Sequence, residues 1–223
     1  MTTTEVADAA AHVLIVPLGA TEQHGPHLPI STDTTIAVAW ASQLALAMGD
    51  ALVAPALPYG SSGEHQSFAG TISIGQDALR LVLIELARSA GVHHRRVIYV
   101  SGHAGNHEPL RSAVEQLRAE GHDVAGLVPR LEGADAHAGH TETSIMLYLE
   151  PASVRTDRLE TGCTEPLHAI IEQLRSGGVV SVAANGVLGD PTASSADDGA
   201  MLWQELIAAS DLGMERRPRS DRA

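Results

Sequence analysis

The sequence predicts a single-domain three-layer α/β/α protein with a mostly parallel central sheet. Short apolar runs alternate with longer segments of helical periodicity, which is typical of parallel sheets covered by helices on both faces. The chain has 223 residues, of which 44% are hydrophobic, enough to bury one sizeable core. No linker or internal repeat divides residues 1–223, so we expect one domain.

Strands are expected where short apolar runs are uninterrupted, at 13–16, 52–54, 97–100 and 124–128, the first of them ending at Pro17. Helices are expected at 34–48, 77–90, from the turn at 101–106 through about 119, and at 141–149, 166–175 and 195–212. Gly49 stops the first helix, and Pro151 follows the one at 141–149. We expect residues 1–11 and 214–223 to be flexible tails.

The composition excludes several classes of function. The net charge of −13 argues against a nucleic-acid or anionic-membrane surface, and no segment has the length of a membrane span. The one cysteine, Cys163, allows no disulfide within the chain, so we expect a cytoplasmic protein. A small structural role is commoner for such a residue than a nucleophilic one.

The first ligand-rich segment, 19–33, follows the first expected strand and carries Glu22, His24 and Asp33. Carboxylates and imidazoles are metal ligands by type. Glu22 and His24 are two residues apart, so they point to one side of an extended segment. Asp33 is placed to return to them and bridge two cations. A solvated turn explains each residue alone but not the set, whereas His27 fits a structural role better than ligation.

Two further segments carry candidate groups. His103 lies in a Gly-flanked turn after the third apolar run, at the same edge of the sheet as the first loop. His137 is placed to move protons, and Glu142 falls in the first turn of a helix, where an acidic residue serves either as a ligand or as a partner of the helix dipole. Both readings of Glu142 stay open.

The long Gly/Ser-rich loop at 58–71 offers candidate substrate contacts in Ser62, Glu64, His65 and Phe68, although Glu64 and His65 are equally compatible with solvated positions. The remaining histidines are scattered and read as surface groups: His12, His93, His94, His107, His122 and His168.

These motifs resemble those of the creatininase family of metal-dependent amidohydrolases. The resemblance rests on PLGATEQHGPHLP at 17–29 with Thr32-Asp33, on GHAGN at 102–106, and on HAG at 137–139 with ETS at 142–144. It implies two divalent metals, held by Glu22, His24, Asp33, His103 and Glu142, with Asp33 bridging. It also implies that His137 handles protons. Iron(II), zinc and manganese all suit such ligands.

One departure concerns the ligand set. Creatininase has a Glu two residues after the motif His, and here that position is Gly105. Members with Gly there use the Glu of the ETS motif, which the resemblance places at Glu142. Other departures, at Ser101, Ala104, Ala69 and His140, remove no proposed ligand.

Within the family, LPYGSSGEH at 57–65 and NGVLGDPT at 185–192 are most similar to peptidases that trim a modified ribosomal precursor peptide. The resemblance implies hydrolysis of an amide to release a C-terminal Val-Tyr-derived piece, and a homo-oligomeric enzyme. Two alternatives remain at this point. One is hydrolysis of a small cyclic amide or formamide, and the other is a non-catalytic metal-binding protein.

Overall fold

Four parallel strands form the sheet, in the order β2-β1-β3-β4. The computed structural model describes residues 1–9 and 12–213. The strands are β1 Val13–Leu18, β2 Ala51–Val53, β3 Arg96–Ser101 and β4 Val124–Leu127. The central pair runs in register from Val13 opposite Arg96 to Leu18 opposite Ser101. All four strands lie where the apolar runs predicted them.

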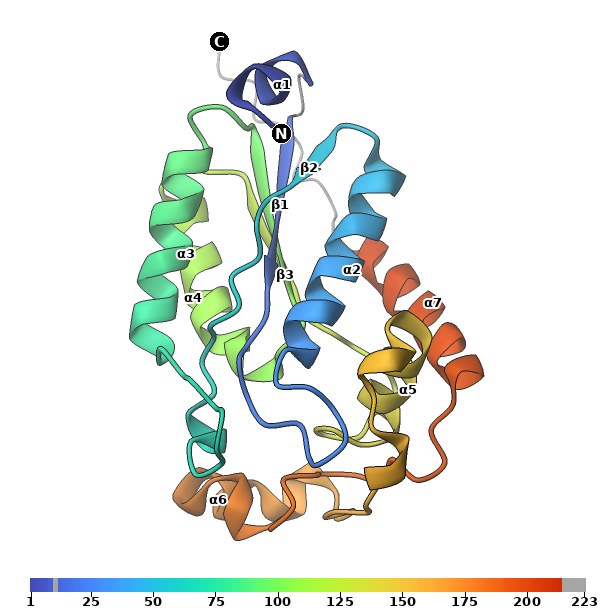
Figure 1. Ribbon diagram of the computed structural model, residues 1–223. Coiled ribbons are helices and arrows are strands. Elements are labelled where there is room, and N and C mark those ends of the chain that lie inside the picture. The colour runs from blue at the N-terminus through green and yellow to red at the C-terminus, as the bar shows by residue number, and fades with distance from the viewer. Residues whose placement is uncertain (10–11, 214–223) are drawn as a thin grey trace.

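Helices cover both faces of this sheet, which confirms the three-layer architecture (Figure 1). α3 and α4 pack on one face, and α2, α5 and α7 pack on the other. The helices are α1 Thr3–Asp8, α2 Thr32–Met48, α3 Gln76–Ala90, α4 His107–Ala119, α5 His140–Leu149, α6 Leu167–Gly177 and α7 Ala196–Gly213. Short 3-10 helices lie at Gly63–His65, Ala104–Asn106, Pro151–Ser153, Thr156–Arg158 and Val179–Ser181.

Two large aromatic side chains anchor the two core layers. Tyr99 of β3 is fully buried against α3 and α4, and its hydroxyl donates to the carbonyl of Leu83 at 2.6 Å. Trp40 of α2 lies in the other layer and donates from Nε1 to Ser210 Oγ of α7 at 2.8 Å. Each buried polar end therefore has a partner, and the apolar bodies contribute burial of about 2–3 kcal/mol apiece.

The structure differs from the expected elements at three places. β1 continues through Pro17 to Leu18. Because N–H groups along a strand point alternately to its two neighbours, the nitrogen of Pro17 points to the side of β2. β2 has already ended at Val53, so the N–H that proline lacks is not needed for a hydrogen bond within the sheet. The expected tail at 1–11 contains α1, held by a capping box between Thr2 and Glu5 and burying none of its residues. Residues 10–11 and the expected tail at 214–223 lie outside the described residues.

α6 is the third difference, because it does not cover a face of the sheet. It lies across the end of the molecule beyond the carboxyl ends of the strands (Figure 1). Its Ile170 packs with Val179, Ala183 and Leu188 in a small cluster of their own. α6 therefore covers the edge where the ligand-rich loops lie. No helix among the described residues is long and apolar enough to cross a membrane.

Candidate metal centre

The loop after β1 brings Glu22 and His24 to the carboxyl edge of the sheet. The Glu22 N–H donates to the Ile30 carbonyl at 3.2 Å, which closes the loop on itself. His24 Nδ1 lies 3.1 Å from the carbonyl oxygen of Glu22, so this nitrogen donates and Nε2 is the nitrogen that can bind a metal once it loses its proton. That Nε2 lies 3.2 Å from Asp33 Oδ1 and 3.8 Å from Glu142 Oε2.

Asp33 and His103 reach the same place from α2 and from the loop after β3. His103 lies 3.2 Å from Glu22 Oε2 through Nε2, and 3.5 Å from Asp33 Oδ2 through Nδ1. This approach requires Gly102, since a Cβ there would lie 2.2 Å from the Asp33 carbonyl oxygen. The glycine in the motif therefore brings the β3 loop against the first turn of α2.

Glu142 is held by the cap of α5. The N–H of Ala138, at a φ of 52°, donates to Glu142 Oε2 at 2.6 Å. Asp135 accepts from the backbone N–H of His140 and, at 3.0 Å, from that of Thr141. The side chain of Asp135 thus satisfies the open N–H groups of the first turn and fixes the direction in which Glu142 points.

The predicted ligands form two sets of three that share one carboxylate. One set is Glu22, Asp33 and His103, and the other is His24, Asp33 and Glu142; within each set the ligand atoms lie within 4.8 Å of one another. Both Glu22 carboxylate oxygens and Asp33 Oδ2 are buried with no hydrogen-bond partner. Unpaired buried carboxylate oxygens are costly unless a cation faces them, so these residues fit two bound metal ions.

A third overlapping set contains Glu22, His24 and His137. His137 Nδ1 lies 3.6 Å from Glu22 Oε1 and 3.9 Å from Glu142 Oε2. The imidazole ring of His137 also packs between the rings of His24 and His65, with both centroid distances 4.3 Å. His137 therefore lies beside a carboxylate from each of the two ligand sets, Glu22 and Glu142.

Electrostatics divides these histidines into two pairs. Burial lowers the pKa of His24 and of His103, but Asp33 acting on His24 and Glu22 acting on His103 outweigh it and raise each pKa to about 10. Burial lowers the pKa of His65 to about 3 and that of His137 to about 4, helped by neighbouring imidazoles. Without metal, the first pair is protonated at pH 7 and the second is neutral.

The two central carboxyl groups also differ. Burial would raise the pKa of Glu22, but His103, His65 and His137 hold it well below its usual value. Burial raises the pKa of Asp33 to about 6, since Glu22 adds to that effect and His24 and His103 only partly offset it. The metal-free cluster thus carries protons on His24 and His103, where positive charge is needed to balance the carboxylates.

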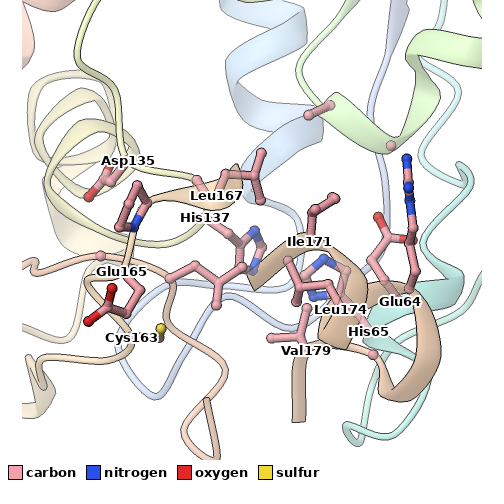
Figure 2. A pocket seen from close by; sticks show the side chains of 18 of the residues that line it. Glu64, His65, Asp135, His137, Cys163, Glu165, Leu167, Ile171, Leu174 and Val179 are labelled. Atoms are coloured by element: carbon pink, nitrogen blue, oxygen red, sulfur yellow. The ribbon is translucent and has the colours of Figure 1, made fainter. Parts of the chain in front are cut away.

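A cavity of about 1220 Å³ opens beside the cluster. Glu64, His65, His103, His137 and Glu142 line its inner side. Figure 2 shows the side chains of Leu167, Ile171 and Leu174 from α6 gathered with His65 and His137 around the same space. The cavity therefore joins polar reacting groups to an apolar wall, as substrate pockets commonly do.

The four expected substrate contacts separate into two pairs. Glu64 and His65 line the cavity, whereas Ser62 and Phe68 do not. Ser62 is fully buried, with its N–H bonded to Ser73 Oγ at 2.9 Å, and Phe68 packs against the α6 cluster. Ser62 and Phe68 therefore pack against other parts of the protein and support the 58–71 loop.

Gly105 stands where no side chain fits. A Cβ there would lie 2.4 Å from His103 Nε2, 2.5 Å from the Ser61 carbonyl and 2.8 Å from Glu64 Oε1. Glu64 thus occupies the space next to Gly105, with Oε1 4.0 Å from His103 Nε2. Burial raises the pKa of this carboxyl. Two carboxylates, Glu142 and Glu64, therefore lie near the centre in the absence of a side chain at Gly105.

Sequence reasoning assigned no role to Gln23 and placed His65 only as a substrate contact. His65 is buried, with Nε2 3.5 Å from Glu22 Oε1, and the Gln23 amide lies 2.8 Å from His65 Nδ1. The position of Gln23, between two predicted ligands in the sequence, was the one local signal for its role.

The other histidines have the roles expected of them. His27 binds Thr143 Oγ1 at 2.8 Å, as a structural residue does. The six scattered histidines are exposed or half-buried.

The chain belongs to the creatininase family: residues 1–210 match the family described as creatinine amidohydrolase. A mycofactocin precursor peptide peptidase of Mycobacterium ulcerans (strain Agy99) is 50% identical over 202 residues, covering 87% of this chain and 81% of that protein. A peptidase of the same name from Mycobacterium tuberculosis (strain ATCC 25618 / H37Rv) is 48% identical over 203 residues, with the same coverage. The creatinine amidohydrolase of Pseudomonas putida is 31% identical over 177 residues, 66% of this chain and 68% of that protein.

Solved structures agree with this assignment. A crystal structure of creatinine amidohydrolase has a TM-score of 0.76 and 27% identity, covering 98% of this chain and 97% of the other. A manganese creatininase structure has a TM-score of 0.75 and 26% identity, covering 96% and 97%. The chain is a hydrolase that acts on amide bonds, which excludes the non-catalytic alternative.

Proposed function

We propose that this hydrolase is a two-metal peptidase that removes the C-terminal Val-Tyr-derived piece from the modified mycofactocin precursor peptide. The observation that carries the proposal is the buried pair of ligand sets at the inner side of the 1220 Å³ cavity. Identity of about 50% to peptidases of that name supports the choice of substrate.

The proposed ligands are Glu22 and His103 on one metal, His24 and Glu142 on the other, and Asp33 between them. The shared carboxylate of Asp33 is common to both sets of ligand atoms, which supports its bridging role. Iron(II), zinc and manganese suit these oxygen and nitrogen donors, and related creatininase structures are of manganese and of zinc–zinc type. When bound, two such ions supply Lewis-acid polarisation of the carbonyl and a hydroxide-like nucleophile at neutral pH.

The other residues bind, orient and move protons. His137 is neutral and within 4 Å of Glu22 and Glu142, so it is placed to carry a proton to the leaving nitrogen. Leu167, Ile171 and Leu174 offer an apolar surface for a hydrophobic peptide end. Glu64 and His65 line the cavity beside the proposed ligands, which supports a role for them in contacting the peptide.

A small cyclic amide or a formamide is the second candidate substrate, since creatinine amidohydrolases share the fold and the family. The size of the cavity and the higher identity to the peptidases, 50% against 31%, favour the peptide. The two readings share one metal centre and differ only in what the cavity holds.

The direct test is incubation of the metal-loaded protein with the modified precursor peptide, followed by mass spectrometry. The expected result is loss of the C-terminal piece, abolished by a chelator and restored by added metal. Parallel reactions contain creatinine and simple formamides. If the peptide stayed intact while a small amide was hydrolysed, the small amide would be the substrate and the peptidase proposal would be wrong.

We further propose that the enzyme acts in the cytoplasm as a homo-oligomer. The single cysteine supports a reducing setting. Membership of the creatininase family, whose members we expect to be homo-oligomers, supports contact between copies. Light scattering coupled to size-exclusion chromatography measures the subunit number, and a monomer at working concentration would overturn this assembly.

A further inference from the structure

The side chain of Gln23 joins three segments behind the metal centre. Its Oε1 accepts from the N–H of Gly25 at 2.9 Å. Its Nε2 lies 2.8 Å from His65 Nδ1, 3.0 Å from the carbonyl oxygen of Gly186 and 3.1 Å from His137 Nε2. Only 6% of the residue is exposed, so these contacts are made away from bulk water.

These contacts fix which end of the amide is oxygen. In the opposite orientation the NH₂ group would face the N–H of Gly25, and the oxygen would face the carbonyl of Gly186. Both contacts would be repulsive. The Gln23 amide is therefore oriented by its backbone partners, independently of the histidines.

The hydrogen atoms can then be counted. His137 Nε2 lies 2.8 Å from the backbone carbonyl of Gln23, and a carbonyl only accepts, so this nitrogen carries the proton. The two hydrogens of the Gln23 amide go to the two remaining acceptors, the carbonyl of Gly186 and Nδ1 of His65. Each donor then has one acceptor, and no hydrogen is left over.

We propose that Gln23 is a positioning residue beside the metal centre: its backbone carbonyl sets the tautomer of His137, and its side-chain amide sets that of His65. His137 is protonated at Nε2 and turns the bare lone pair of Nδ1 toward Glu22 Oε1 and Glu142 Oε2. His65 is protonated at Nε2 and turns that N–H toward Glu22 Oε1, 3.5 Å away. One ring presents an acceptor to the centre, and the other presents a donor.

With these tautomers, His137 and His65 have different roles in the hydrolysis. These roles rest on the proposed function. As water adds its oxygen to the amide carbonyl carbon, one water proton passes to Nδ1 of His137. The carbon–nitrogen bond then breaks, and the same proton passes from Nδ1 to the leaving nitrogen, so His137 ends as it began. His65 holds the Glu22 carboxylate in place and takes no proton.

The NGVLGDPT segment, residues 185–192, belongs to the same hydrogen-bond network. A Cβ at Gly186, whose φ is +81°, would lie 1.9 Å from Gln23 Oε1, so only glycine admits the amide. Two residues later, the N–H of Leu188 donates to the carbonyl of His137 at 2.9 Å. The segment thus holds both the partner of Gln23 and the backbone of His137.

The tautomers are measured without substrate, by long-range ¹H–¹⁵N NMR of the full-length zinc-loaded protein. His65→Asn and His137→Asn variants assign the two rings. Both rings are expected to show a protonated Nε2 and a bare Nδ1. A protonated Nδ1 on either ring would overturn the proposal, and so would a zinc-bound Nδ1 on His137. This result is independent of whether the peptide is the substrate.

Gln23→Glu tests the consequence, because a carboxylate cannot donate to His65 Nδ1 and the ring must protonate there. With equal metal content, kcat is expected to fall about 10–100-fold, as when the support of a metal ligand is lost, because His65 no longer holds Glu22 in place, with little change in KM. Gln66→Glu adds the same charge at an exposed position beside His65 and is expected to retain kcat. Gln23→Met, which removes the donors without adding charge, is expected to lose kcat as well. Full kcat in a metal-loaded Gln23 variant would refute the role.

Discussion

At the scale of single residues, the centre depends on buried carboxylates that have no partner except a cation. Both oxygens of Glu22 are buried without a hydrogen bond, while His65, His103 and His137 surround them at 3.2–3.6 Å. A charged group in that setting is stable only when positive charge faces it. Removing its charge therefore disturbs chemistry more than folding.

Glu22→Gln keeps the shape of the side chain and removes that charge. Because a Lewis-acid metal supplies several kcal/mol of transition-state stabilisation, we expect kcat to fall on the order of 10²–10³-fold or more. The fold, followed by circular dichroism, is expected to persist. Glu115→Gln on the exposed face of α4 is the matched control. Retained activity in Glu22→Gln would contradict the metal assignment.

Gly105→Ala tests the crowded space between His103 and Glu64. The added Cβ would lie 2.4 Å from His103 Nε2, so the imidazole must move. We expect metal affinity to fall about 10–100-fold, as when the support of a ligand is lost, and stability to fall by about 1–3 kcal/mol from overpacking. Gly63→Ala, where a Cβ meets nothing within 4 Å, is the matched control for both measurements. Isothermal titration with zinc and a denaturant titration give the two values, and equal affinities in the two variants would exclude the clash.

The residues predicted from the sequence share one property. Glu22 and His24 lie in one short loop, and Asp33 lies in the first turn of the helix that follows it. His103 follows another strand that ends at the same edge, so local spacing sufficed to group these four. Gln23 could not be assigned a role in that way, because its partners lie 42, 114 and 163 residues further along the chain. Their arrangement depends on packing that no local pattern contains.

At the scale of elements, capping places a reactive side chain. Asp135 accepts from the first two N–H groups of α5, those of His140 and Thr141, which directly precede Glu142. Ser195 does the same at α7, where its Oγ accepts from the N–H of Asp198 at 3.1 Å. The two caps have similar chemistry, but only the one on α5 precedes a proposed ligand.

Asp135→Ala and Ser195→Ala therefore form a matched pair. Each is expected to cost about 1 kcal/mol of stability, the usual value of a lost cap. Asp135→Ala is also expected to lower metal affinity and kcat, because Glu142 is no longer fixed. Thermal unfolding, zinc titration and peptide cleavage are measured on both variants. Equal activity in the two would show that Glu142 does not depend on its cap.

The elements themselves followed the sequence closely, since uninterrupted apolar runs mark buried parallel strands. The position of α6 could not be predicted from the sequence. Its apolar face predicted a helix at 166–175, but the pattern does not distinguish packing on the sheet from packing across the strand ends. Only contact with Val179, Ala183 and Leu188 decides that α6 covers the cavity.

At the scale of the whole molecule, metal binding, protonation and folding are one coupled equilibrium. Without metal, the pKa values of His24 and His103 are raised to about 10, so both rings hold protons at pH 7. A metal requires their neutral forms, and the cluster exists only in the folded chain. Loading the site must therefore release protons and stabilise the fold.

We expect release of about two protons for full loading at pH 7, one from each raised imidazole. Because protons compete with metal below these raised pKa values, affinity is expected to increase as pH rises from 6 toward 9. At free metal about 100-fold above Kd, each bound ion stabilises the fold by about 2.7 kcal/mol, and a chelator removes that gain. Calorimetry in buffers of different ionisation enthalpy counts the protons, and melting curves with and without chelator measure the stabilisation. His103→Asn, which removes one raised imidazole, is expected to release one proton fewer. If this variant released as many protons as the wild-type protein, metal binding would not displace a proton from His103.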